Sequence, residues 1–169
     1  MNTQVLQVLR RGALAGMGGG MVMAMWSMIV MWLTGAGFWT PLNLIANTVW
    51  RSAPLDATFS GGALALGLVL HMMMSMGLGM AFAVVVRTAS RLGASRAALA
   101  MTGMIFGIMV WVVMQYGIWH AIDAAAAPKF TPWVFALGHL MFGAATALLT
   151  GVSPVRHGDA VPHLHGTPA

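Results

Sequence analysis

Two histidines, His71 and His139, lie inside two different apolar stretches of this sequence, where charged side chains are nearly absent. An imidazole in such a place can hydrogen-bond a neighbouring helix, ligate haem iron or copper, or transfer a proton. Each is followed two residues later by a methionine, Met73 or Met141, and thioethers are ligands for copper. These four residues therefore form the candidate site.

Three interpretations of the pair stay open, and we favour the first. In the structural one, each imidazole hydrogen-bonds a carbonyl or hydroxyl on a neighbouring helix. In the second, His71 and His139 are the axial ligands of a b-type haem. In the third, they bind copper with Met73 and Met141. His120 is expected at the membrane surface instead, beside Asp123.

The composition indicates a membrane protein. Hydrophobic residues make up 59% of the 169 residues and charged residues only 7%, whereas soluble domains carry about a quarter charged residues. The absence of cysteine excludes thiolate zinc sites and iron–sulfur clusters. The net charge of +5 forms no basic stripe, so we expect no nucleic-acid partner.

Four apolar stretches are long enough to cross a bilayer. They cover residues 14–33, 63–86, 97–119 and 133–150. We expect an all-α, multi-pass four-helix bundle over residues 1–153, followed by a flexible polar tail over residues 154–169 that contains His157, His163 and His165.

The arginines predict the orientation. With both termini on one side, that side carries six arginines and the other only Arg51 and Lys129. The positive-inside rule then places both termini in the cytoplasm of a bacterial cell, with the protein in the inner membrane. On the outer side, Thr40 and Pro41 open a short apolar segment up to Trp50, which we expect as an interfacial helix or a lid over the histidines.

Small residues at four-residue spacing predict close helix contacts. Two such stripes contain the histidines, and the first and third spans carry glycines in the same pattern. Phe38–Pro41 also resembles Lys129–Pro132, so the chain has features of a repeat of two helical hairpins. The expected packing residues are Gly12, Gly16, Gly20, Ser75, Gly79, Gly103, Gly107 and Gly143.

Several function classes are disfavoured. Glutamate is absent, and the three aspartates lie outside the spans, so no acid is available for ion coupling inside the membrane. No serine–histidine–acid set shares one membrane depth. We therefore expect a non-catalytic protein rather than an enzyme.

The segment Pro41–Ala46, the stripe from Gly67 to Gly79, and Gly138-His139 with Gly143 form one pattern. In it the chain resembles small, uncharacterised four-span inner-membrane proteins of bacteria. This resemblance implies the architecture and no activity. We therefore expect an accessory or assembly subunit in the lipid bilayer, joined to other membrane subunits or to copies of itself. The alternative is a haem b or copper-binding membrane protein using His71 and His139.

Overall fold

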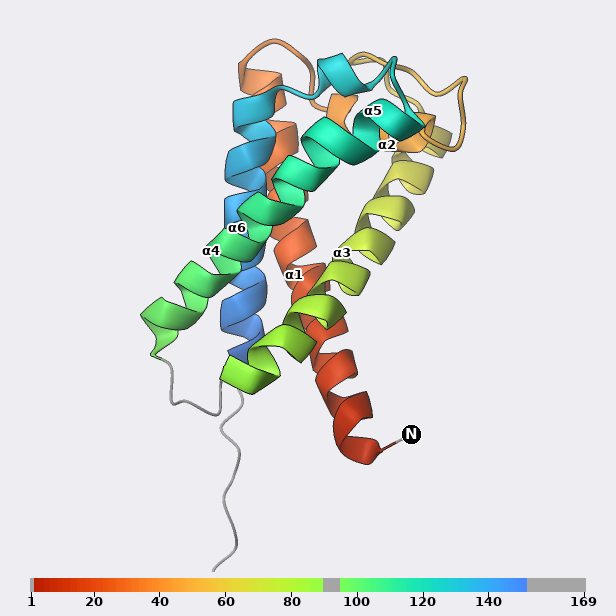
Figure 1. Ribbon diagram of the computed structural model, residues 1–169. Coiled ribbons are helices and arrows are strands. Elements are labelled where there is room, and N and C mark those ends of the chain that lie inside the picture. The colour runs from red at the N-terminus through yellow and green to blue at the C-terminus, as the bar shows by residue number, and fades with distance from the viewer. Residues whose placement is uncertain (1, 90–94, 152–169) are drawn as a thin grey trace, which may run out of the picture.

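The computed structural model describes residues 2–89 and 95–151, and all regular structure in these residues is helical (Figure 1). Four stretches are long and apolar enough to cross a membrane. The elements in chain order are α1 (Thr3–Leu33), α2 (Thr40–Asn47), α3 (Gly61–Ala89), α4 (Arg96–Val113), the π-helical turn η2 (Met114–Ile118), α5 (Trp119–Ile122), the 3₁₀ turn η3 (Ala127–Lys129) and α6 (Pro132–Gly151).

The four predicted spans lie within these helices, but α1 begins well before residue 14. Its first turns are polar, so hydropathy alone misses them. Asn2 caps the helix by accepting a hydrogen bond from the backbone N–H of Gln4 at 3.1 Å. At the other end, Gly35 and Gly37 have positive φ, and the N–H groups of Ala36 and Gly37 donate to the Met31 carbonyl. The chain therefore turns sharply out of α1.

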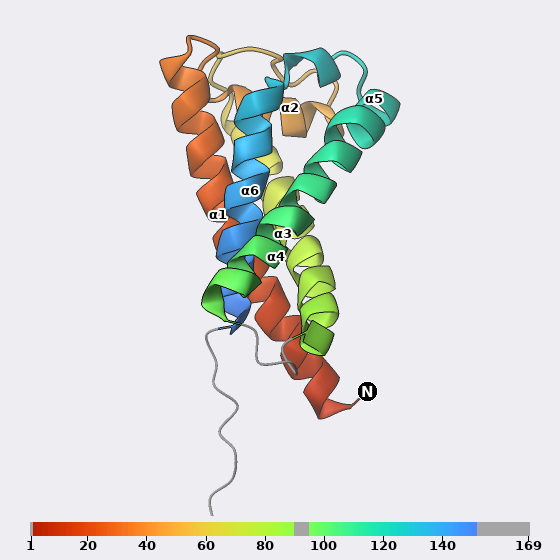
Figure 2. The same ribbon diagram turned by 60° about the vertical axis from the view of Figure 1, so that its left-hand side comes forward.

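The helix α1 lies at the centre of the arrangement. It packs along α3 on one side and along α6 on the other, and α6 in turn packs along α4 (Figures 1 and 2). The helices α3 and α4 have little contact, apart from Phe82 against Phe106, whose ring centroids are 5.1 Å apart. The bundle therefore has an open side between α3 and α4.

Small residues are in contact where these helices cross. A Cβ on Gly16 of α1 would overlap the carbonyl oxygen of Ser75 on α3, and one on Gly107 of α4 would overlap that of His139 on α6. Close backbone approach of this kind stabilises helix pairs in lipid. The predicted packing glycines lie in these two contacts: Gly12, Gly16, Gly20 and Gly79 between α1 and α3, and Gly103, Gly107 and Gly143 between α4 and α6.

The three consecutive glycines of α1 serve two different neighbours. A Cβ on Gly20 would overlap Ser75 of α3, whereas one on Gly19 would overlap Thr146 of α6. Consecutive residues point about 100° apart around a helix. Gly18 completes the run against Leu149 of α6. The run therefore lets both α3 and α6 approach the backbone of α1.

The short helix α2 is buried, which differs from the expected position on the membrane surface. All eight of its residues are buried, and Leu44 and Ala46 have no exposed surface. A Cβ on Gly67 of α3 would overlap the carbonyl oxygen of Leu42, so α2 lies directly against α3. An interfacial helix would leave one face towards lipid or water. The position of α2 instead fits the lid interpretation.

Two asparagines of α2 hold the following loop over it. The Asn43 amide donates to the carbonyls of Asp56 and Thr58 at 3.0 and 2.9 Å. The Asn47 amide donates to those of Arg51 and Ala53 at 3.2 and 2.7 Å. At the exposed end of the loop, the Thr58 backbone N–H donates to the Asp56 carboxylate, which lowers the pKa of Asp56. This loop covers α2 from the solvent side.

The third span is interrupted by the π-helical turn η2, which the sequence did not predict. The helix continues through it as α5 up to Ile122. His120 Nδ1–H donates to the Gln115 carbonyl at 3.0 Å, across this turn. A π turn inserts an extra residue and rotates the part of the helix after it. It thereby turns Trp119 into the bundle, where that side chain is buried.

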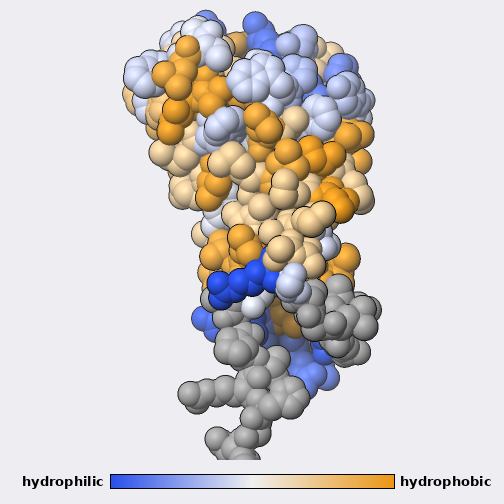
Figure 3. Space-filling view, turned by 90° about the vertical axis from the view of Figure 1, so that its left-hand side faces the viewer, coloured by the Kyte–Doolittle hydropathy of each residue, from blue (hydrophilic) through white to orange (hydrophobic). Residues whose placement is uncertain are grey.

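The two ends of the molecule differ in charge, and short helices lie across only one of them. The N-terminus, the end of α3 and the start of α4 lie at one end, and α2, α5 and η3 lie at the other (Figure 1). Figure 3 shows an apolar surface between these ends, with hydrophilic residues towards both. Arg10, Arg11, Arg87 and Arg96 belong to the first end and Arg51 and Lys129 to the second, which is the grouping that the orientation prediction requires.

Candidate functional site

The open side of the bundle between α3 and α4 is called the wedge below. A cavity of about 50 Å³ lies there, with His71 and His139 in its wall. Ile45 of α2 and Trp119 of α5 also line it. Apart from Ser75, the remaining wall is apolar and includes Phe135 and three methionines. Both histidines therefore line one small, partly open cavity.

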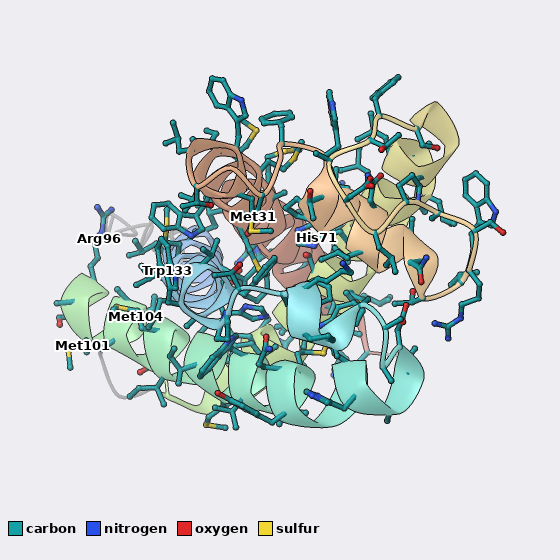
Figure 4. The ribbon with its side chains drawn as sticks, turned by 90° about the horizontal axis from the view of Figure 1, so that it is seen from above. Met31, His71, Arg96, Met101, Met104 and Trp133 are labelled. Atoms are coloured by element: carbon teal, nitrogen blue, oxygen red, sulfur yellow. The ribbon has the colours of Figure 1, made fainter. Side chains whose placement is uncertain are left out.

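His71 is oriented by the backbone of α1. It lies on the buried face of α3, where only 5% of it is exposed, and its Nε2 is 2.9 Å from the Gly20 carbonyl oxygen. Because a carbonyl only accepts, Nε2 must carry the hydrogen and donate it. A neutral imidazole then has its lone pair at Nδ1. This contact with a neighbouring helix is the one that the structural interpretation predicts, and Figure 4 shows His71 among the helices.

His139 is oriented by its own helix. It is 8% exposed, and its Nδ1 donates to the Phe135 carbonyl one turn earlier, at 2.7 Å. The lone pair of a neutral imidazole is then at Nε2. The structural interpretation expected a partner on a neighbouring helix, and the bond is instead local. It leaves the outer nitrogen of the ring without a hydrogen bond among the described residues.

The predicted methionine ligands do not lie with the histidines. Neither Met73 nor Met141 lines the cavity, and they are 63% and 37% exposed. Three other methionines line the cavity: Met23 of α1, Met74 of α3 and Met114 of η2. Met73 and Met74 are neighbours in the sequence but point about 100° apart, so residue spacing alone does not show which of them lines the cavity.

A b-type haem does not fit this site. The cavity volume of about 50 Å³ is far below that of a porphyrin macrocycle. The outer nitrogen of His71, Nε2, is bonded to Gly20, so only Nδ1 could reach an iron atom. Because Nδ1 lies next to the ring carbon that joins the backbone, it offers little room for a macrocycle. The glycines near the histidines also leave no room for a macrocycle, because the backbones of neighbouring helices lie against them.

His120 and Asp123 do not form the expected surface pair. Asp123 is buried, and its Oδ2 forms an ion pair with Nη1 of Arg51 at 2.9 Å. Arg51 also donates from Nη2 to the Ile122 carbonyl at 2.6 Å, while Asp123 Oδ1 accepts from the N–H groups of Ala125 and Ala126. Arg51 thus joins the loop after α2 to the end of α5. His120 is exposed, as expected for a surface histidine.

Sequence reasoning missed two of the residues that line the cavity. Ile45 was expected in an interfacial helix or a lid, and Trp119 was not among the candidate site residues, yet both line the cavity. The lid alternative was the only signal for Ile45. No sequence feature marks the π turn that brings in Trp119. His157, His163 and His165, in the predicted tail, lie outside the described residues.

Among the described residues, no three histidine, aspartate or glutamate side chains come together as a metal site. The cavity therefore offers two imidazoles and thioethers as its possible ligands. No family model, characterised protein or solved structure matches this chain. The geometry of the helices and of the cavity is therefore the evidence that bears on its function.

Proposed function

We propose that this chain is a non-catalytic accessory or assembly subunit of a larger membrane complex in the bacterial inner membrane. The wedge between α3 and α4 supports this proposal. In the four-helix arrangement, α4 packs chiefly on α6. Only 11% of the residues in the most apolar 18-residue stretch of the third span are buried, against 50% in that of α1. A helix of another subunit can seat in this wedge.

One wall of the wedge is shaped for a close helix contact. Gly77 of α3 is exposed, and a Cβ there would meet nothing within 4 Å. Ala81, one turn later, is exposed as well. Met74 and Leu78, beside them on the helix, line the cavity. Small residues four apart allow two backbones to approach within a membrane, so the notch formed by Gly77 and Ala81 suits a partner's transmembrane helix.

The surface available to a partner is mainly helical. The helix α2 and the loop after it pack back onto the end of the bundle. Helix faces are therefore the surface through which a subunit of this form would recognise others. A second copy of the chain is the other occupant that the experiment distinguishes.

The experiment is purification of the full chain from its native membranes in mild detergent, followed by native mass spectrometry. We expect a stoichiometric complex containing a second, different membrane protein. Gly77→Leu fills the notch and should release that protein, whereas Gly117→Leu, at another exposed glycine with open space around it, should not. A chain that purifies alone, or a complex that survives Gly77→Leu, would overturn the proposal. Release of a second copy instead would identify a homo-oligomer.

A further inference from the structure

We propose that the cavity binds one monovalent copper ion, Cu(I), through Nδ1 of His71 and Nε2 of His139, with a thioether of the cavity wall completing the site. This goes beyond a docking role and does not depend on one. It rests on the two imidazoles, on the methionines beside them, and on the size and charge of the cavity.

The two imidazoles are arranged as metal ligands usually are. A ligating histidine commonly donates its second ring N–H to a carbonyl, which fixes the ring and leaves the other nitrogen for the metal. His71 does this with Gly20 and His139 with Phe135, at 2.9 and 2.7 Å. Both residues are more than nine-tenths buried and line the same cavity. Their remaining nitrogens have no hydrogen bond in the described part of the chain.

The other lining residues select the kind of metal. Met23, Met74 and Met114 bring thioethers from three different elements. Thioethers are soft ligands and favour Cu(I), which imidazole also binds. The cavity wall holds no carboxylate, so a divalent ion would keep its full charge in an apolar setting. Zinc, iron and manganese sites also use more nitrogen or oxygen ligands than two histidines supply.

The size of the cavity fits a single ion. A volume of about 50 Å³ exceeds what one water molecule needs and suits a single metal ion held by side chains of the cavity wall. A single positive charge inside a membrane is costly and requires direct ligands. Here the polarised N–H groups of both imidazoles, each facing a backbone carbonyl, increase the basicity of the ligating nitrogens.

The test is an anaerobic titration of the purified full chain with Cu(I), against a chromophoric Cu(I) chelator as competitor. We expect one tightly bound equivalent. His71→Gln places an amide N–H near the Nε2 position and can keep the Gly20 bond while removing Nδ1. His139→Asn likewise keeps a donor near Nδ1 and removes Nε2. Each variant should weaken binding at least about 10-fold, with an unchanged circular dichroism spectrum and melting temperature.

Matched controls separate this site from others. Among Met23→Leu, Met74→Leu and Met114→Leu, the variant that removes the thioether ligand should weaken Cu(I) binding and remove sulfur from the X-ray absorption spectrum of the bound copper. Met73→Leu, Met141→Leu and His120→Gln, at residues that do not line the cavity, should change neither. The combined change His157→Gln, His163→Gln and His165→Gln tests the tail and should also leave the tight equivalent in place.

Three results would overturn the proposal. They are the absence of a tight equivalent in the unaltered chain, an affinity that survives both His71→Gln and His139→Asn, and loss of the equivalent with the three tail substitutions. Since none of these measurements involves a partner protein, they leave the docking proposal to its own test.

Discussion

Gly107 of α4 lies against the backbone carbonyl of His139 on α6, so close that a Cβ at Gly107 would overlap that oxygen. The backbone that carries one cavity histidine is thus held by a residue without a side chain. Gly20 orients the ring of the other histidine, because its carbonyl accepts the His71 hydrogen bond at 2.9 Å. The helix contacts and the cavity are therefore parts of one arrangement.

Gly107→Ala should lower the stability of the folded protein, because the added methyl group cannot fit without separating α4 from α6. We expect a loss of about 1–3 kcal/mol, measured by thermal or denaturant unfolding in detergent. Gly117→Ala is the control, since its Cβ would meet open space, and it should change the stability by less than about 0.5 kcal/mol. Equal effects of the two substitutions would contradict the helix contact.

Gly20→Ala should act on α3 rather than on α4. Its Cβ would overlap Ser75, and His71 Nε2 lies close by at 3.6 Å. The substitution should therefore destabilise the α1–α3 contact by roughly 1–3 kcal/mol and displace the His71 ring. Hydrogen exchange of α3 amides is the measurement. Exchange that rises only in α4 would show that the helices are paired differently.

Asp123→Asn should loosen the outer loops. Asp123 is buried and paired with Arg51, which is 57% exposed on its side chain. The substitution removes the charge and leaves the Arg51 guanidinium facing a neutral group. Because Arg51 can turn to solvent, we expect a modest loss of stability, about 1 kcal/mol. Proteolysis within residues 51–58 should become faster, and Arg51→Gln should give the same pattern.

Asn43→Asp tests how the loop is held over α2. The Asn43 amide donates to the carbonyls of Asp56 and Thr58, whereas a carboxylate would only accept and would be repelled by them. The loop should come away from α2, with a loss of about 1–3 kcal/mol and faster amide exchange in α2. Unchanged exchange would mean that the loop is held in another way.

The orientation can be measured directly because the chain contains no cysteine. Ser52→Cys and Ala97→Cys place single thiols at exposed residues at opposite ends of the molecule. We expect a membrane-impermeant maleimide to label Ser52→Cys from outside intact cells and Ala97→Cys only after the membrane is opened. The opposite pattern would reverse the predicted topology.

The sequence was sufficient to predict the four long apolar helices. Spans of the required length, and the position of His71 and His139 within theirs, can be derived by counting residues along a helix. The spacing of Gly16 and Gly107 likewise predicted close contacts. Which helix each glycine contacts could not be read in the same way, since Gly19 and Gly20 are neighbours in the chain and face different helices.

The details of the site needed the three-dimensional structure. Met73 and Met74 are adjacent in the sequence. Because methionines lie on all sides of this helix, no apolar pattern shows which of the two lines the cavity. Trp119 depends on the π turn, which changes the helical register without a local sequence signal. The place of Ile45 in the cavity wall depends on how α2 is buried. A short apolar segment has the same sequence pattern whether it lies on lipid or beneath a loop.

The glycines of α1 contact both α3 and α6, and this has a consequence for the order in which the fold can form during synthesis. The first helix is synthesised first, and its contact with α3 can form as soon as α3 has entered the membrane. Its other glycine face, at Gly18 and Gly19, contacts α6, which is synthesised last of the four long helices. Until α6 is made, that face of α1 lacks the helix that it contacts in the folded protein. Completion of the fold therefore waits for the final helix.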